Sequence, residues 1–371
     1  MMKIQCVEAL FLVSTMLISS CTIDINQPSP LLPTALSSSN RTPQTINGTP
    51  SPLTTIIPVT WGNLNLSGKL VYPSAVYQNQ SVSMGIRLLD LVTGYVTTIF
   101  QAPDGSWVDA VSVSPDNKLM ILSYTPPIHT PYGGTRALYS LPLDGKGSPK
   151  LLFTPTSEYD QYYQPEWSPD GSLLYFTHQS DNKGLLTYDI WRMAYPDGKP
   201  EMLAEDASWP RVSGDSTRLV YVSINSGTGV NQLILANADG TEARKVPLKG
   251  SVTSIIDAPM FSTNKQSIFF SAPNLGQSFV PGVMPVKLNF SAHLADGSIP
   301  SDLWSVPITG GKPQQLTNIR SLALYGNFSP DKKYIALYSA DGIFVMQPDG
   351  SGLTELVDDV GQVGGTVNWI P

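Results

Sequence analysis

Residues 164–176 read Gln-Pro-Glu-Trp-Ser-Pro-Asp-Gly-Ser-Leu-Leu-Tyr-Phe, and weaker copies of this segment recur through most of the chain. Each copy places an apolar residue and a serine before a short polar turn, and an apolar run follows the turn. The five turn serines are Ser114, Ser168, Ser213, Ser262 and Ser329, spaced roughly 50 residues apart. A repeat of this length is typical of propellers and solenoids.

The chemistry of one repeat predicts four antiparallel strands. Pro-Asp-Gly at 169–171 favours a tight turn, because Pro presets φ, Asp bonds to its own backbone and Gly tolerates positive φ. The apolar run after the turn predicts a second strand. A third strand at 189–193, a turn at Asp197-Gly198 and a short fourth strand at 200–203 complete the unit. Four such strands form one blade of a β-propeller.

This unit resembles the TolB-type β-propeller repeat, which is also seen in the propeller domains of prolyl-oligopeptidase-like enzymes. The pattern extends over residues 61–371. The copy that contains Ser262-Thr263-Asn264 departs most, and an insertion at 273–301 follows it. The resemblance implies a propeller fold with protein partners, but no segment specific for the partner of that family is identifiable here.

The two ends of the repeat region are complementary. Residues 367–371 read as a first strand, with Trp369 at the place of Trp167, and nothing follows them. Residues 66–72 read as a turn and a second strand without a first strand. Together they complete one blade, because joining strands from both ends removes free sheet edges. The sequence therefore predicts an all-β fold: a six-bladed β-propeller of four-stranded antiparallel blades, closed by N- and C-terminal strands in one blade.

The N-terminal region predicts export. Residues 1–20 read as a lipoprotein signal peptide, whose apolar part is too short for a permanent membrane span. Ile18-Ser19-Ser20-Cys21 resembles the bacterial lipoprotein box, which predicts lipidation of Cys21; an ordinary signal peptide with a coincidental cysteine is the alternative. Residues 21–60 are rich in Ser, Thr and Pro and predict a disordered tether. The expected location is the outer face of the cytoplasmic membrane or the periplasm.

The net charge narrows the possible partners. It is −7 at pH 7, and the chain contains no cluster of Lys or Arg. Binding to nucleic acid requires basic groups that neutralise phosphates, so this class of partner is not expected. Contact with the membrane is expected only through the lipid anchor at Cys21.

Sequence motifs for catalysis are missing. The chain has no Gly-x-Ser-x-Gly motif, no P-loop and no dinucleotide fingerprint. The histidines His129, His178 and His293 fall in predicted loops of different blades, so no metal or cofactor is predicted. The aspartates Asp116, Asp170, Asp215 and Asp331 are interpreted as turn residues rather than acid–base groups.

The two faces of the predicted propeller differ. One face carries the short Pro-Asp-Gly and Asp-Gly turns, whereas the other carries the longer loops between second and third strands and the connections between blades. We call the latter the long-loop face. The insertion at 273–301 is expected to form a lid or an extra hairpin there. Candidate ligand-binding residues on the connections and inner strands are Trp107, Asp160, Tyr162, Tyr163, Trp209, Arg211 and Tyr325. Aromatic and Arg side chains are typical anchors of binding sites, although they also seal channel mouths.

These observations predict a non-enzymatic, monomeric, lipid-anchored propeller that binds a protein, peptide or envelope glycan through its long-loop face. One alternative is a polysaccharide lyase or hydrolase, which would require His129, His178 and a carboxylate to lie close together. Another is a structural or sensory domain of the cell envelope.

Overall fold

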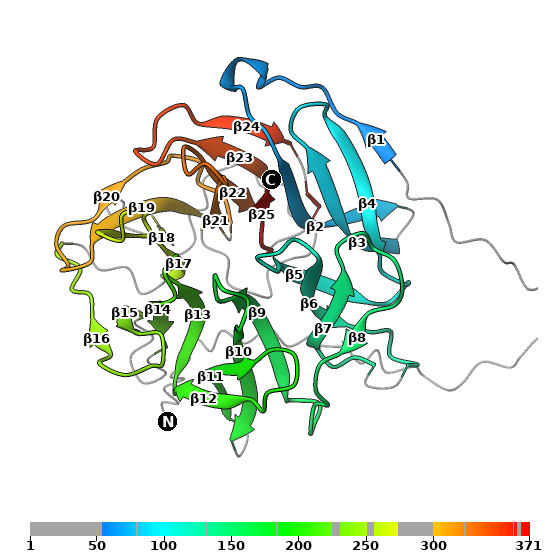
Figure 1. Ribbon diagram of the computed structural model, residues 1–371, viewed down its shortest axis with the longest axis horizontal. Helices are drawn as coiled ribbons and strands as arrows, with labels where there is room; N and C mark the ends of the chain where they lie inside the picture. The colour runs from blue at the N-terminus through cyan, green and yellow to red at the C-terminus, as the bar shows by residue number, and fades with distance from the viewer. Residues whose placement is uncertain are drawn as a thin grey trace, which may run out of the picture.

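The computed structural model describes residues 54–78, 81–130, 133–182, 185–224, 231–250, 256–273, 300–322, 324–358, 360–361 and 365–371. Six antiparallel sheets are arranged in a ring around one axis, as Figure 1 shows. The prediction of an all-β, six-bladed propeller is confirmed. Apart from a short 3-10 turn, η1 (Gly62–Leu64), the regular structure of the described residues is all strand.

Five of the six blades are continuous segments of four strands, ordered from the ring axis outward. Blade 2 contains β5 (Trp107–Val113), β6 (Leu119–Thr125), β7 (Ala137–Pro142) and β8 (Lys150–Leu151), and blade 3 contains β9 (Gln161–Trp167), β10 (Leu173–Asn182), β11 (Leu185–Ala194) and β12 (Glu201–Ala204). Blade 4 contains β13 (Ala207–Val212), β14 (Arg218–Ser223), β15 (Gln232–Asn237) and β16 (Arg244–Lys245), and blade 5 contains β17 (Asp257–Phe261), β18 (Ser267–Pro273), β19 (Ser301–Pro307) and β20 (Gln314–Gln315). Blade 6 contains β21 (Tyr325–Phe328), β22 (Ile335–Ser339), β23 (Gly342–Met346) and β24 (Thr354–Val357).

The remaining blade, the closing blade, joins the two ends of the propeller. Its strands from the axis outward are β25 (Asn368–Ile370), β2 (Lys69–Gln78), β3 (Ser81–Asp90), β4 (Tyr95–Gln101) and β1 (Thr54–Ile56). Leu70 of β2 pairs with Trp369 of β25, so closure by strands from both ends is confirmed. The blade differs from the expectation in having a fifth strand. Because β1 pairs with β4, the sheet begins before residue 61, inside the range 21–60 interpreted as tether.

Side chains of the closing strand also bind the next blade. The Thr366 hydroxyl accepts a hydrogen bond from the Val111 amide of β5 at 2.8 Å and lies 2.6 Å from the Val111 carbonyl. The Asn368 side chain accepts from the Val113 amide at 3.0 Å and donates to the Val111 carbonyl at 2.8 Å. The ring is therefore held shut by strand pairing on one side of β25 and by side-chain hydrogen bonds on the other.

The core lies between neighbouring sheets. In one cluster Val71 of the closing blade, Leu122 of blade 2 and Phe176 of blade 3 are buried together. Trp167, Trp304 and Trp369 are all buried. Burying such apolar surface is the main force that holds the blades together.

The loops between second and third strands are shorter in blade 3 than expected. β10 and β11 form a long hairpin that extends to Asn182 and Leu185, which leaves only a short connection between the second and third strands. His178 is consequently a strand residue, not a loop residue. Most of the insertion at 273–301 lies outside the described residues, and no lid can be assigned to it. Among the described ranges given above, no helix is long and apolar enough to cross a membrane.

Candidate functional site

The inner strands are distorted at one repeated position, four residues before the turn serine. Gln164, Trp209 and Ala258 occupy this position in blades 3, 4 and 5, with φ of 51°, 58° and 45°. Each lies at a register shift between the first and second strands. A β-bulge re-aims the side chains that follow it, and positive φ in a non-Gly residue requires support from the surroundings. In blades 3 and 4 the bulges precede Glu166 and Arg211, whose side chains meet between the blades.

A buried ion pair occupies the middle of the channel. Arg211 of β13 lies 3.3 Å from Glu166 of β9, and its guanidinium donates a hydrogen bond to the Gly326 carbonyl of β21 at 3.1 Å. The same guanidinium stacks over the Tyr325 ring, 4.6 Å from its centroid. One cation thus connects blades 3, 4 and 6. The space enclosed by these residues is too narrow for a water molecule.

Burial controls the protonation of this cluster. It raises the pKa of the Glu166 carboxyl, and the attraction of Arg211 opposes that rise. It also raises the pKa of the Tyr325 phenol, so this group stays neutral at physiological pH. A buried pair of this kind is worth little for stability by itself, but losing one partner leaves an uncompensated charge. The arrangement is therefore a fixed connection across the ring.

A second ion pair lies closer to the long-loop face. Arg136, next to the start of β7, lies 3.0 Å from Asp109 near the start of β5, and its guanidinium lies 4.5 Å from the centroid of the Tyr163 ring. Burial raises the pKa of Tyr188, which interacts with Tyr163, to about 12. Arg136 Nε and Asp109 Oδ1 have no hydrogen-bond partner among the described residues. Both of these atoms are buried, so the pair is held in place mainly by its own ion pair and the Tyr163 ring.

A third cluster surrounds Asp160. Its carboxylate accepts hydrogen bonds from the Thr156 amide at 2.6 Å and the Tyr162 hydroxyl at 2.9 Å, and it contacts His178 Nε2. The His178 ring stacks on Tyr162, with centroids 4.8 Å apart. Despite burial, the hydrogen bonds hold the pKa of Asp160 below its usual value. Asp160 and Tyr162 are themselves buried, whereas His178 is half-buried. A ligand would therefore contact this cluster through His178.

The structure brings some of the predicted binding residues together and separates others. Trp209, Arg211 and Tyr325 form one group, with the Trp209 and Tyr325 ring centroids 6.1 Å apart. Asp160 and Tyr162 form another, Tyr163 belongs to the Arg136 cluster, and Trp107 is half-buried against the core between blades. The seven residues therefore form separate groups and do not make up a single site. Cys21 lies outside the described residues.

Sequence reasoning missed Glu166, Arg136, Asp109 and Gln164. A signal for Glu166 and Gln164 was present, because both stand in the segment that defines the repeat. Counting back two and four residues from the turn serines of blades 3 and 4 identifies Glu166 and Gln164, and Arg211 and Trp209, which meet between these blades. Arg136 and Asp109 have no such signal, since their pairing depends on how the loop between β6 and β7 returns toward β5.

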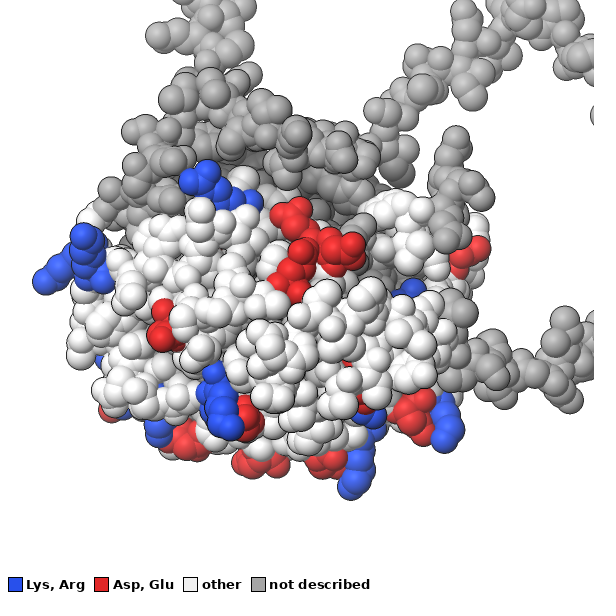
Figure 2. Space-filling view, turned by 90° about the horizontal axis from the view of Figure 1, so that it is seen from above, with Lys and Arg blue, Asp and Glu red and all other residues white. Residues whose placement is uncertain are grey.

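The turn aspartates serve the turns themselves. In all five turns the serine hydroxyl donates to the Asp or Asn side chain two residues later, at 2.6–2.8 Å. Several of these carboxylates also pair with a nearby lysine, as in Lys118–Asp116 at 3.2 Å and Lys333–Asp331 at 3.3 Å. Figure 2 shows basic and acidic side chains interspersed along the lower edge of the view rather than segregated by sign.

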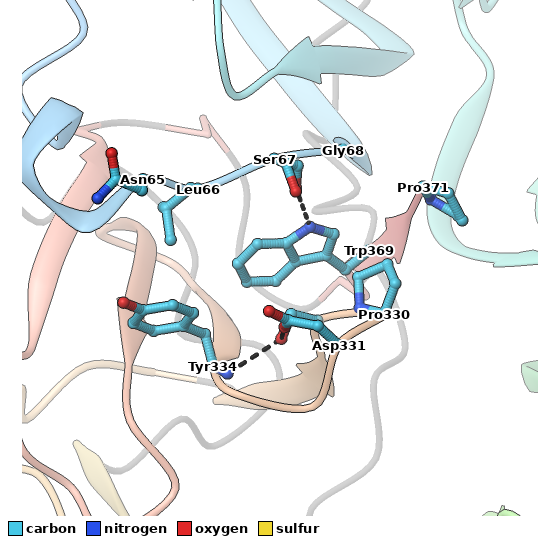
Figure 3. Close-up of a pocket in the computed structure, with 10 residues that line it drawn as sticks. Asn65, Leu66, Ser67, Gly68, Pro330, Asp331, Tyr334, Trp369 and Pro371 are labelled. Carbon is cyan, nitrogen blue, oxygen red and sulfur yellow. Dashed lines mark hydrogen bonds between the residues drawn. The ribbon is translucent and has the colours of Figure 1, made fainter.

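A pocket lies where the closing blade meets blade 6, and we call it the seam pocket. Its volume is about 280 Å³. Three segments line it: residues 65–68 before β2, the turn between β21 and β22 with Tyr334, and Trp369 with Pro371. The Tyr334 and Trp369 rings lie side by side in Figure 3, with centroids 6.5 Å apart and an interplanar angle of 22°. Sequence reasoning did not predict this pocket, which lies beside the short turns.

Metal-ligating side chains do not converge in the part of the chain that the structure describes. No group of three or more His, Cys, Asp or Glu residues could hold an ion there. His178 meets one carboxylate, that of Asp160, whereas His129 is exposed on the loop between β6 and β7. The third histidine, His293, lies outside the described residues.

Comparisons with known proteins give structural matches only. No protein-family model and no curated protein sequence matches the chain. TolB from Acinetobacter baumannii superposes with a TM-score of 0.59 at 18% identity, over 82% of this chain and 67% of that chain. A protein assigned as TolB from Agrobacterium tumefaciens superposes with a TM-score of 0.54 at 17% identity, over 82% of this chain and 99% of that chain. An oligogalacturonate lyase in complex with manganese superposes with a TM-score of 0.45 at 12% identity, over 74% of this chain and 72% of that chain.

The chain therefore shares the TolB-like propeller fold. Identities this low show the fold and not the activity, because propellers support many unrelated functions. The lyase match is weaker than the two TolB matches and adds no functional argument.

Proposed function

We propose that the protein is a non-enzymatic binding propeller of the cell envelope, anchored by a lipid at Cys21, which binds a protein, peptide or glycan through its long-loop face. The anchor places it on the outer face of the cytoplasmic membrane or in the periplasm. The TolB-like fold supports a binding role at the level of fold analogy.

The observation that carries this proposal is the chemical difference between the two ends of the channel. Four of the five turns on the short-turn face use their aspartate in the same internal hydrogen bond, and Asn264 takes that place in the fifth. Identical chemistry gives little basis for specificity. At the other end the blades contribute different groups, among them Arg136, Asp109 and Tyr163.

The Arg136 cluster is suited to a polar ligand. Its cation is held by a carboxylate and an aromatic ring, an arrangement that fixes its position in advance. Function is commonly located on loops and strand ends supported by a rigid scaffold, and β5, β7 and β9 supply that support here. The exposed Tyr159, in the connection before β9, extends this surface outward.

The test is a comparison of matched variants. A ligand is first sought with peptide and glycan arrays, using the folded propeller. Tyr159→Ala and Tyr163→Ala are then compared with Lys146→Ala and Lys199→Ala on the opposite face. Truncating an aromatic anchor is expected to weaken binding by about thirtyfold, and the lysine changes are expected to have no effect. The reverse pattern in folded variants would assign binding to the other face.

A further inference from the structure

The seam pocket exists because the closing blade lacks a covalent turn. In blade 3 the chain passes from Trp167 through Ser168 and Gly171 into β10. In the closing blade the corresponding strands, β25 and β2, are not consecutive in the chain, and residues 65–68 take the place of the turn. Trp167 packs against Tyr195, with ring centroids 4.7 Å apart, and Trp369 packs against Tyr334, with centroids 6.5 Å apart, but only Trp369 lines the seam pocket. The interruption of the repeat therefore leaves a pocket beside this aromatic position, although the Trp369 ring is as buried as that of Trp167.

The two aromatic rings present apolar surface to this pocket. The indole N–H of Trp369 donates to the Ser67 carbonyl at 2.9 Å, and the Tyr334 hydroxyl donates to the Leu64 carbonyl at 3.2 Å. Both polar ends are thus used within the protein, and both rings are fixed in orientation (Figure 3). The ring surface that remains for a ligand belongs mainly to the half-buried Tyr334, because Trp369 is buried and contributes only its edge.

The polar side of the pocket is formed by a carboxylate and its neighbours. Asp331 is exposed, and the Ser329 hydroxyl holds the pKa of its carboxyl below the usual value. Lys333 lies 3.3 Å from the same carboxylate, so the charge at this wall is balanced. Asn65 and Ser67 add exposed hydrogen-bonding groups. The wall therefore favours a neutral ligand with hydroxyl groups over an anion or a strong cation.

We propose that the seam pocket binds one ring of a neutral sugar. A pyranose offers an apolar ring face for Tyr334 and Trp369 and hydroxyl donors for Asp331. A proline ring has no donor and would gain no hydrogen bond from the Asp331 carboxylate. The volume of about 280 Å³ is near the lower limit for small-molecule pockets, which suits a single ring rather than a large ligand.

Binding at this place is linked to ring closure. The pocket requires β25 in position, because Trp369 and Pro371 form one wall. A ligand that binds only the closed ring stabilises it by mass action. Sugar binding is therefore expected to raise the melting temperature in a saturable manner. This site is separate from the long-loop face, so the two proposals succeed or fail independently.

The experiment uses the folded propeller with glucose, galactose, N-acetylglucosamine and a proline-rich peptide, and measures binding by saturation-transfer NMR and calorimetry. Asp331→Asn is expected to weaken sugar binding about tenfold, the effect of losing a charged hydrogen-bond acceptor. Asp170→Asn is the matched control, because it changes the same turn position in blade 3, away from the pocket. Tyr334→Leu is expected to abolish binding, whereas Tyr334→Phe retains the ring and the affinity.

Three results would overturn the proposal. They are the absence of binding by all three sugars at millimolar concentration, equal effects of Asp331→Asn and Asp170→Asn, and binding of the peptide in place of the sugars. Both aspartate variants are expected to fold, since Asn264 already fills this turn position in blade 5. The Tyr163→Ala variant of the long-loop face is expected to bind sugar at the seam normally.

Discussion

The channel and the seam pocket are both places where side chains from different blades meet, yet they differ in how their polar groups are used. In the channel, Glu166 and Arg211 are buried and paired, and the space around them is filled. At the seam, Asp331 is exposed, and about 280 Å³ remains open beside two aromatic rings. The difference indicates that channel charges maintain the fold, whereas seam groups are available to a ligand.

The largest expected effect concerns the strand on which the seam depends. Deleting residues 366–371 removes Trp369 from its packing site together with the Thr366 and Asn368 hydrogen bonds to β5. The loss of one buried Trp side chain alone costs about 3–5 kcal/mol. The deletion is therefore expected to lower the urea midpoint of unfolding strongly, measured by circular dichroism.

A control for this deletion is Trp167→Ala, which removes the equivalent indole but leaves the ring covalently intact. The deletion is expected to destabilise the protein more than this substitution does. If the deletion variant unfolded at the same urea concentration as the unmodified protein, strand β25 would not be what holds the ring shut.

The second prediction concerns the ion pair between Glu166 and Arg211 in the channel. Arg211→Met leaves the Glu166 carboxylate buried without its cation and is expected to cost about 3–5 kcal/mol of unfolding free energy. Combining it with Glu166→Leu removes the second charge and is expected to recover most of that loss. A single variant as stable as the unmodified protein would show that the pair does not maintain the fold.

The pH dependence of the Arg211→Met variant gives an independent check. Burial raises the pKa of Glu166, so the folded state binds its proton more readily than the unfolded state, whose Glu pKa is about 4.3. As the pH rises above about 4.3, the unfolded state loses this proton first and stability falls. Removing Arg211 increases the rise in pKa, so this variant is expected to regain stability between pH 7 and pH 5. A further Glu166→Gln change should abolish that recovery.

The sequence was sufficient for the architecture because the repeat is local. The turn serine, the Asp after it and the apolar run all lie within a dozen or so residues, and their spacing predicts strands by short-range chemistry. Closure was also predictable, since Trp369 matches Trp167 and residues 66–72 lack a first strand. The added strand β1 was not, because its three β-branched residues form only a short run within a polar, Pro-rich region.

The site was less predictable because it depends on contacts across the ring. Glu166 and Arg211 occupy the same repeat position in adjacent blades, and their pairing follows only once the inner strands are placed around one axis. The bulges at Gln164 and Trp209 re-aim these side chains, and positive φ in such residues has no sequence signal. The contact between His178 and Asp160 was missed for a related reason, since the strand β10 is longer than its composition indicated.

The smallest expected change in stability concerns Asp331 in the seam pocket. Asp331→Asn is expected to leave the unfolding midpoint at pH 7 nearly unchanged, because the Asn oxygen can accept the Ser329 hydrogen bond as Asn264 accepts that of Ser262 at 2.8 Å. The carboxylate is exposed, and its pairing with Lys333 is a surface ion pair of the kind that contributes little. Its lowered pKa means that any stabilisation is present above the unfolded Asp value of about 3.9 and is lost as the pH falls through the lower folded value. The variant and the unmodified protein should therefore converge in strong acid. A large loss at pH 7, unmatched by Asp170→Asn, would mean that the seam carboxylate maintains the fold as the channel charges do, and the distinction between the two regions would fail.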